Sequence, residues 1–429
     1  MTNGDQRRPK VFGIVALLLA VGCSTAMAIG GEAPPDVPAP DVPAPHGPDT
    51  LQNIPGHVTT IDGRSVEGDI SAADATSLTV DTAQQPKRIK LADAIEINFA
   101  DTKRLHTAGF QVLFLDGSGL NVDKIVSATE DSLKVNAASL GGDATLPLDH
   151  IMGVVFDVNA KKAGDYRNAI MTRQADHDFV LLPNQDSVAG KLNLPSWKDR
   201  TVTVDVDGQA REFKGEDAVG VRLQVLAEKV VPPALHVEVT LIDGSLLTGL
   251  LDGVDKGKLV VDVQGAKLGF LTGAIRSIHV VGSRMKYLSE LEPSEKEEYP
   301  LLKSLPTAFP MHKNRTSAGK PILLNSKPYE SGLGVHAYSH LTYSLNQQYE
   351  MFYTLVGIDD NMAKPGKIQY QVLVDGEVKK TGALSSHKAD AVEVDVKGAR
   401  KLELIVNFGD DNDQGDSVVW ANARLIKKE

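Results

Sequence analysis

The sequence is short of several residue types, and each shortage excludes a class of protein. One cysteine among 429 residues excludes a disulfide framework and any zinc or iron–sulfur site that needs several cysteines. The 45 Lys and Arg are outnumbered by 56 Asp and Glu, and the net charge of −11 argues against a general nucleic-acid binder, which needs a basic surface. No run of about 18 apolar residues follows residue 29, so no later segment is expected to span a membrane.

Aromatic residues are also scarce, at 5% of the chain, and they are unevenly distributed. Eight of the nine tyrosines and one of the two tryptophans follow residue 286. We therefore expect at least two regions of different chemistry, with most of the aromatic side chains in the last one.

Motifs of known catalytic sites are missing as well. The sequence contains no G-x-S-x-G, H-E-x-x-H, P-loop or dinucleotide fingerprint. His336 and His340 would lie about 13 Å apart on an extended strand, which is too far to share a metal. Gly415-Asp416-Ser417 is similar to the nucleophile block of some esterases, but no histidine follows it. A glycosidase with two distant carboxylates stays open, although no region is long enough for its usual barrel. We predict no catalytic residues and no enzymatic activity.

The N-terminus has the three parts of an export signal. Basic residues precede an apolar run over 11–21, and Ala26-Met27-Ala28 fits a cleavage site. We expect residues 1–28 to be a signal peptide, with an uncleaved anchor as the alternative. Cys23 follows Ala20-Val21-Gly22, which is similar to a bacterial lipobox and would make Cys23 a lipid attachment site.

A proline-rich linker is expected over residues 29–54, because proline favours an extended backbone. The protein is therefore predicted to be exported, either periplasmic or extracellular. It would contact a membrane only through the N-terminal signal or a lipid on Cys23.

The middle of the chain repeats one pattern of short strands. Copies 1, 2 and 4 have an Asp-Gly turn, at Asp62-Gly63, Asp116-Gly117 and Asp243-Gly244. Copy 3 has Asn184 at the position of the aspartate. Asp-Gly between alternating apolar residues indicates a tight hairpin. About five short strands per copy suit a small SH3-like or Sm-like barrel. The four predicted barrels are residues 55–102, 103–160, 175–228 and 233–283, with a short helix over 161–175. Because they lack aromatic and charged clusters, we favour a scaffold array over binding modules and expect no nucleic-acid partner.

After a charged linker or lead-in segment that begins at Arg284, strand patterns return with longer loops. Leu341–Leu345 and Ile368–Val374 alternate between apolar and polar residues, and the second ends at an Asp375-Gly376 turn. Roughly eight strands are typical of an antiparallel sandwich, most often a jelly roll. The predicted fold class is all-β, an array of about four small barrels followed by a C-terminal β-sandwich over 284–429.

Five ordered blocks of this region resemble the NPCBM family of carbohydrate-binding modules. The blocks are Leu288–Pro293, Ser331–Ala337, Val356–Asp360, Val374–Gly376 and Gly409–Ala421. The resemblance implies a discoidin-like, galactose-binding-like β-sandwich of the kind found beside glycoside hydrolases. The combination of repeats, export signal and this module looks like proteins of planctomycete-type bacteria.

The resemblance also implies where a sugar would bind. Sugars are held by aromatic rings against their CH faces and by hydrogen bonds to their hydroxyls. The candidate residues are His336, Tyr338, Asp359, Asp360, Asn361 and Trp420. Two alternatives stay open, a core position for Trp420 and a structural hydrogen-bonding role for His336.

An acidic loop follows Gly409. Its aspartates, Asp410, Asp411, Asp413 and Asp416, are hard oxygen ligands dense enough to bind Ca²⁺, and a solvated acidic loop is the alternative. We therefore predict an exported, non-catalytic protein that recognises envelope or extracellular glycans and holds at most a structural calcium. A structural or protein-interaction role without a sugar ligand is the competing hypothesis.

Overall fold

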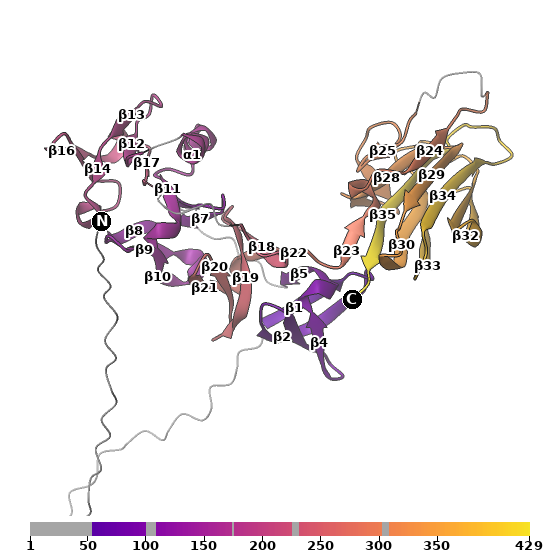
Figure 1. Cartoon of the computed structure of the whole chain (residues 1–429), viewed down its shortest axis with the longest axis horizontal. Coiled ribbons are helices and arrows are strands. Elements are labelled where there is room, and N and C mark those ends of the chain that lie inside the picture. The colour runs from indigo at the N-terminus through magenta and orange to yellow at the C-terminus, as the bar shows by residue number, and fades with distance from the viewer. Residues whose placement is uncertain (1–53, 100–108, 174–175, 225–230, 303–308) are drawn as a thin grey trace, which may run out of the picture. The chain divides into compact units, whose positions relative to one another are not determined.

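The computed structural model describes residues 54–99, 109–173, 176–224, 231–302 and 309–429 (Figure 1). The predicted signal peptide, its cleavage site, Cys23 and the proline-rich linker up to residue 53 lie outside these ranges. In the ranges that are described, no helix is both long and apolar enough to cross a membrane.

The prediction of an all-β protein is confirmed. The described residues hold a single α-helix, α1 (Ala163–Thr172), beside strands and short 3-10 helices. The helix follows the second copy of the repeat, inside the stretch over which a helix is predicted.

The first and fourth copies have the same strand order. In copy 1 the last strand pairs with the first, which gives the order β5-β1-β2-β3-β4. Copy 4 repeats this order as β22-β18-β19-β20-β21. The elements are β1 (Ile54–Thr60), β2 (Ser65–Ala73), β3 (Ser77–Asp81), β4 (Pro86–Lys90), η1 (Leu91–Asp93), β5 (Ala94–Phe99), β18 (His236–Leu241), β19 (Leu246–Asp255), β20 (Lys258–Val263), β21 (Ala266–Leu271), η6 (Thr272–Ala274) and β22 (Ile275–Val281).

Copies 2 and 3 differ because their second strand is broken in two. The outer strands β8-β9-β10 and β14-β15-β16 therefore form separate three-stranded sheets. The closure of the four copies into barrels stays a prediction. The elements are β6 (Phe110–Phe114), β7 (Gly119–Val122), β8 (Lys124–Ala128), β9 (Ser132–Ala137), η2 (Ala138–Leu140), β10 (Gly142–Pro147), η3 (Leu148–His150), β11 (Ile151–Val155), β12 (Phe179–Leu181), β13 (Ser187–Ala189), β14 (Lys191–Leu192), η4 (Leu194–Ser196), β15 (Val202–Val206), β16 (Gln209–Phe213), η5 (Gly215–Asp217) and β17 (Gly220–Arg222).

All four copies have the same hairpin turn after their first strand. In copy 4, Asp243 Oδ1 accepts a hydrogen bond from the backbone N–H of Ser245, and Gly244 has a left-handed φ of 89°. In copy 3, Asn184 Oδ1 accepts from the N–H of Asp186, and Gln185 takes the left-handed position with a φ of 70°. Because the amide oxygen of Asn184 replaces the carboxylate, the altered sequence keeps the turn.

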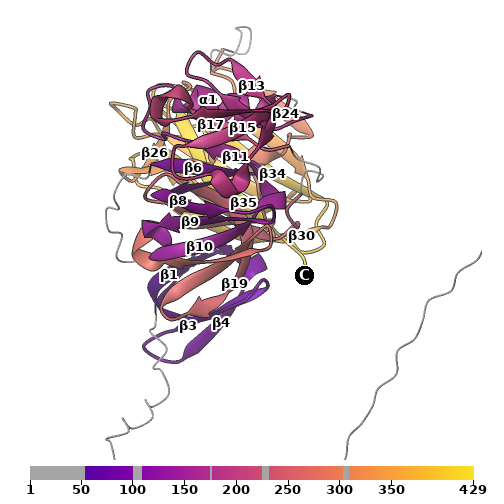
Figure 2. The ribbon, with the colours of Figure 1, turned by 90° about the vertical axis from the view of Figure 1, so that its left-hand side faces the viewer.

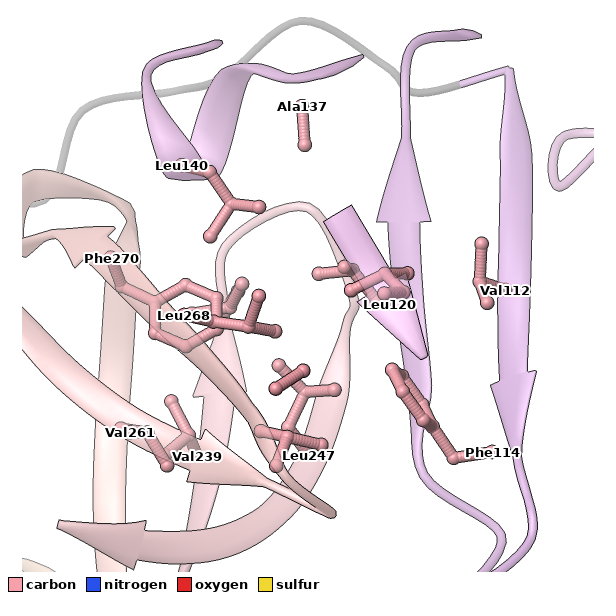
Figure 3. Packing of buried hydrophobic residues seen from close by; sticks show 14 of the residues in the cluster. Val112, Phe114, Leu120, Ala137, Leu140, Val239, Leu247, Val261, Leu268 and Phe270 are labelled. Atoms are coloured by element: carbon pink, nitrogen blue, oxygen red, sulfur yellow. The ribbon is translucent and has the colours of Figure 1, made fainter. Parts of the chain in front are cut away.

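The copies do not lie in the order of the sequence. Their closing strands pair β22 with β5 and β11 with β17, and the second strands pair β19 with β7. The spatial order is therefore copy 3, copy 2, copy 4, copy 1 along one sheet (Figure 2). One apolar core runs through all four copies, and Figure 3 shows Leu120 and Phe114 of copy 2 beside Leu247 of copy 4.

The C-terminal region is a sandwich of two antiparallel sheets, as predicted. One sheet has the order β25-β28-β35-β30-β33, with β23 also paired to β35, and the other has the order β24-β29-β34-β31-β32. The elements are β23 (Met285–Tyr287), η7 (Leu288–Glu290), β24 (Glu295–Glu298), β25 (His312–Lys313), β26 (Ile322–Leu324), β27 (Lys327–Tyr329), β28 (Gly332–His336), β29 (Ser339–Ser344), β30 (Tyr349–Ile358), β31 (Ile368–Val374), β32 (Glu377–Leu384), β33 (Asp390–Asp395), β34 (Lys401–Phe408) and β35 (Ser417–Lys427).

The segment after Arg284 is a lead-in to the sandwich, which settles the alternative of a linker. Strands β23 and β24 each pair with the sandwich, and Leu288 is buried in its core. Arg284 also bonds to copy 1, where its N–H donates to the carbonyl of Ala92 at 2.8 Å. The sandwich thus follows the repeats without a free connection.

Candidate functional site

Two glycines of the NPCBM-like blocks, Gly334 on β28 and Gly357 on β30, let another segment pack closely against the sheet that contains β28, β35 and β30. A Cβ at Gly334 would overlap the backbone carbonyl of Arg315, and a Cβ at Gly357 would lie 2.9 Å from Leu324. The segment that leads into β26 therefore packs on the outer face of this sheet, where Leu324 joins a small apolar cluster. This close approach explains the motif glycines. The candidate functional groups lie at the ends of β28 and β30.

Three predicted site residues, His336, Asp359 and Asp416, meet at one end of this sheet. His336 ends β28 and is paired in register with Ser417 at the start of β35. The N–H of Ala337 donates to the carbonyl of Asp416 at 3.2 Å, and the N–H of Asp359 donates to the carbonyl of Ser417 at 2.9 Å. Residues far apart in the sequence are brought together because β35 lies between β28 and β30.

A pocket of about 180 Å³ opens beside this sheet end. Aromatic rings dominate its lining, and acidic-loop residues complete it; the lining residues are Tyr299, Pro300, Phe309, His336, Ala337, Tyr338, Asp413 and Gln414. We call this the ring pocket. The Tyr299 and Tyr338 rings stack with centroids 4.3 Å apart, and the Phe309 and His336 rings stack with centroids 5.2 Å apart.

Strand pairing explains the tyrosine stack. Strand β24 pairs with β29 as far as Glu298 and Ser339. The ladder continues one step, because Tyr338 donates its N–H to the Tyr299 carbonyl at 3.1 Å and Tyr299 donates to the Tyr338 carbonyl at 3.3 Å. Residues paired in this way have neighbouring side chains on one face of the sheet. Burial, followed by the proximity of Tyr299, raises the pKa of the Tyr338 hydroxyl, so this group is a proton donor at neutral pH.

A hydrogen bond also fixes the segment of the second ring pair, Phe309 and His336. Glu298 Oε1 accepts a hydrogen bond from the N–H of Met311 at 2.6 Å, which fixes the segment that carries Phe309. Phe309 is still 45% exposed, so its ring is open to a ligand. His336 Nδ1 lies 2.9 Å from the Ala337 carbonyl, which can only accept, so Nδ1 carries the proton. This leaves Nε2 as the ring nitrogen that accepts a hydrogen bond whenever the imidazole is neutral.

The Asp359–Asn361 turn ties loops together. Asp359 is 1% exposed, and its Oδ1 accepts from the N–H and the side-chain amide of Asn361. Asp360 Oδ2 accepts from the N–H of Ser326, and the Asn361 amide donates to the Pro321 carbonyl. None of the three lines the ring pocket. The hydrogen bonds of these residues fix the segment around β26, and their contact with a sugar stays a prediction.

Trp420 is a core residue. It lies on β35, between β28 and β30, and its side chain is 0% exposed. Its ring meets the ring of Tyr370, on β31 of the opposite sheet, edge-on with centroids 5.8 Å apart. A ligand at the surface cannot reach it. The expectation of a sugar contact is wrong, because Trp420 points inward from the central strand of its sheet, and the open alternative of a core position holds.

The four aspartates of the acidic loop do not share one site. Among the described residues, no group of three or more His, Cys, Asp or Glu side chains is spaced to hold a metal. Asp410 is exposed and forms an ion pair with Lys367 at 2.9 Å, and Asp413 lines the ring pocket. Asp416 is 0% exposed, and among the residues that the structure describes neither of its carboxylate oxygens has a hydrogen-bond partner. Burial, followed by the charges of Asp411 and Asp413, raises its pKa to about 7.

Sequence reasoning found His336 and Tyr338 of the ring pocket and missed Tyr299, Phe309 and Gln414. The two missed rings lie in the segment between the lead-in and the first recognised glycine block, where the strand pattern is weak. The unequal distribution of tyrosines pointed to the region but not to the residue. Only strand pairing across the β24 and β29 edge brings Tyr299 to Tyr338.

Residues 284–426 match the family model of the NPCBM/NEW2 domain. The match confirms the resemblance and supports a carbohydrate-binding role for this region. A Renibacterium salmoninarum protein with the provisional name endo-alpha-N-acetylgalactosaminidase is 32% identical over 110 residues. This alignment covers 25% of the present chain and 7% of that protein, so the chain spans only a small part of its curated relative.

Two solved structures of Clostridium perfringens are also similar. A CBM51 module from GH95, in complex with methyl-galactose, is 28% identical over 33% of this chain and 99% of that chain, with a TM-score of 0.29. The CBM51-2 and INT domains of ZmpB, with CBM51-2 in complex with GlcNAc, are 24% identical over 40% of this chain and 38% of that chain, with a TM-score of 0.31.

Proposed function

Residues 284–426 form an NPCBM/NEW2 domain, and from this premise we propose that the chain is an exported, non-catalytic protein that binds a glycan in the ring pocket. The observation that carries the proposal is the coincidence of two stacked ring pairs with polar side chains in one small pocket. Export rests on the signal in the sequence, and the absence of catalysis rests on the lack of catalytic motifs.

The pocket has the two kinds of contact that a sugar needs. The rings of Phe309 and Tyr338 offer apolar surface for the CH face of a pyranose. Asp413 and Gln414 add a carboxylate and an amide, which accept from or donate to sugar hydroxyls. His336 Nε2 is a further acceptor. A neutral, hydroxyl-rich ligand matches this lining better than a charged one, because Asp413 is the single carboxylate among its lining residues.

Phe309→Ala tests this proposal. The full chain is titrated calorimetrically with a panel of monosaccharides that includes methyl-galactose and N-acetylglucosamine. Removal of the Phe309 ring should weaken binding about tenfold or more, because a lost stacking ring costs roughly 1–3 kcal/mol.

Val378→Ala is the matched control, because Val378 is exposed to a similar extent, 49%, and lies on β32 outside the ring pocket. It should bind like the unaltered chain. No binding of any glycan by the folded chain, on this panel and on a glycan array, would favour the competing structural or protein-interaction role.

We also propose that a calcium ion binds at Asp416. A buried carboxylate with two unpartnered oxygens suits a cation, and the backbone around it is built from glycines. A Cβ at Gly366 would overlap Asp416 Oδ1 and would lie 2.5 Å from the Gln414 carbonyl oxygen. A Cβ at Gly415 would lie 2.6 Å from the Lys364 carbonyl oxygen. Carboxylate and carbonyl oxygens are the ligands that Ca²⁺ takes in proteins.

The ion would neutralise Asp416 and order the loop that brings Asp413 and Gln414 to the ring pocket. Thermal unfolding with calcium and with EDTA tests this. Chelation should lower the Tm of the unaltered chain and leave Asp416→Asn unchanged, whereas Asp410→Asn, the exposed control, should respond like the unaltered chain. An equal Tm with and without EDTA would contradict the calcium proposal.

A further inference from the structure

Copies 2 and 4 are joined by an interface with internal two-fold symmetry. Gly119 and Leu246 pair directly, and each is three residues after the turn position of its own copy, Asp116 or Asp243. Ser118 and Ser245 are each two residues after the turn. Thr248 donates its N–H to Ser118 Oγ at 2.9 Å, and the N–H of Asn121 donates to Ser245 Oγ at 2.9 Å. Both donors are five residues after their turns, so each half of the contact repeats the other.

Each copy therefore has two edges that can pair. One is the closing strand, which joins copy 1 to copy 4 and copy 2 to copy 3. The other is the hairpin edge just described, which joins copy 2 to copy 4. The array uses all four closing strands, and within the described ranges the hairpin edges of copies 1 and 3 do not make this contact.

The sandwich occupies the hairpin turn of copy 1. The buried Arg424 side chain donates from Nε to the Ile61 carbonyl at 2.8 Å, and its guanidinium fills the space beside Gly63. At the corresponding turn of copy 4, the Asn121 amide donates to the Asp243 carbonyl at 2.7 Å. Arg424 thus takes the place that a neighbouring repeat takes elsewhere.

Copy 3 keeps an open hairpin edge. Its second strand, β13, is the end strand of the sheet, and in the described part of the chain it pairs with β12 alone. Ser187 and Ala189 are exposed. Leu182 donates to the Asp186 carbonyl, as the matching residues do in the other copies. Because successive residues of a strand direct their N–H groups to opposite sides, the N–H groups of Ser187 and Ala189 point away from β12.

The residue two positions after the turn decides which edges are compatible. It must accept a hydrogen bond, as Ser118 and Ser245 do. Copy 1 has Arg64 at this position, which can only donate, and copy 3 has Asp186, whose carboxylate can accept. The hairpin edge of copy 3 is therefore chemically able to repeat the contact between copies 2 and 4, and that of copy 1 is not.

We propose that the β13 edge pairs with the β13 edge of a second copy of this chain, in the two-fold arrangement of β7 with β19. Ser187 would lie opposite Ser187 of the second copy, and the N–H of Ala189 would donate to the carboxylate of Asp186 across the axis. Such an exposed edge is a template for strand pairing. The internal contact supplies the register and the symmetry, and a closed two-fold contact limits the assembly to a dimer.

The dimer would carry two sandwiches, which matters if the proposed sugar binding is correct. Two sites on one particle bind a glycan-coated surface more tightly than one, typically by a factor of about 10²–10⁴ when both can engage. This consequence rests on the proposed function, whereas the dimer itself does not. The proposal of a dimer can therefore be refuted or supported independently of the proposal of sugar binding.

Sedimentation equilibrium of the full chain over a wide range of concentrations tests the dimer. The unaltered chain should dimerise reversibly, and Asp186→Lys should weaken the dimer at least about tenfold because it replaces the acceptor with a donor. Asp186→Ser, which copies the residue of copies 2 and 4, should keep the dimer. A monomer at every concentration, or equal dimerisation by Asp186→Lys, would overturn the proposal.

A disulfide test locates the contact. Directly opposite residues of an antiparallel pair have Cα atoms about 4.5–5.5 Å apart, which is within the reach of a disulfide. In a Cys23→Ser background, Ser187→Cys should form a covalent dimer on mild oxidation. Ser65→Cys, three residues after the turn of copy 1, is the matched control and should stay monomeric. Equal cross-linking by both variants would show that the contact is not specific to copy 3.

Discussion

Replacing Trp420 with alanine should cost the sandwich stability and should leave the sugar affinity of the folded protein unchanged. The side chain is 0% exposed and lies on the central strand β35, between Leu333 of β28 and Val356 of β30. Truncation of a buried tryptophan leaves a cavity and costs about 3–5 kcal/mol. This range includes the edge-on contact with Tyr370, which is worth roughly 0.5–1.5 kcal/mol beyond its buried area.

Urea unfolding measures the cost, and calorimetric titration under native conditions measures the affinity. Because a cost of this size is a large part of a domain's stability, Trp420→Phe serves as a milder variant that keeps a ring in the core. The unfolding midpoint should fall in the order unaltered chain, Trp420→Phe, Trp420→Ala. A Trp420→Phe protein of unchanged stability that has lost its sugar affinity would refute the assignment of Trp420 to the core.

Three further predictions test the framework around the site. Gly334→Ala should destabilise the sandwich by about 1–3 kcal/mol in urea unfolding, because a Cβ at this position overlaps backbone atoms of Arg315 and Thr316. Gly376→Ala is the control for backbone strain, because a Cβ there meets no atoms within 4 Å but the residue has a φ of 83°. Arg424→Ala should cost about 1.5–3 kcal/mol and raise protease cleavage near residue 283, because it removes the buried hydrogen bond to Ile61 and the contact with the Tyr353 ring; an unchanged cleavage rate would count against the attachment of the sandwich to copy 1. Hydrogen bonds from the Thr76 side chain and backbone lower the pKa of Asp74 to about 2. The contribution of Asp74 to the stability of the folded state is therefore complete above pH 3.8 and is lost as the pH falls towards 2. The free energy of unfolding between pH 4 and 2 should depend less on pH in Asp74→Asn than in the unaltered chain, and identical pH profiles would contradict this.

The sequence predicted the all-β class, the hairpin turns of the repeat and the sandwich, because each depends on local signals. Asp-Gly turns and alternating residues mark hairpins wherever they occur, and the left-handed Gln185 shows that the pattern survives even when the glycine is lost. The spatial order of the copies could not be predicted in this way. It depends on which strand edges meet, and the decisive residues, such as Ser118 and Ser245, are ordinary serines until the edges are paired.

The site was predicted in part for the same reason. His336 lies within a recognisable motif and Tyr338 follows that motif directly. Tyr299 and Phe309, in contrast, reach the ring pocket through pairing between β24 and β29 and through the Glu298 contact with Met311. Trp420 was misassigned because a motif residue can serve the core as well as a ligand. Its burial, which only the fold determines, separates these roles.

The location of a bound sugar tests the central claim most directly. The crystal structure of the full chain with the monosaccharide that binds best in the titration panel should show one sugar ring against Phe309 or Tyr338. The hydroxyls of that sugar should lie within hydrogen-bond distance of Asp413 or Gln414. A sugar bound elsewhere, with the ring pocket empty, would contradict the account.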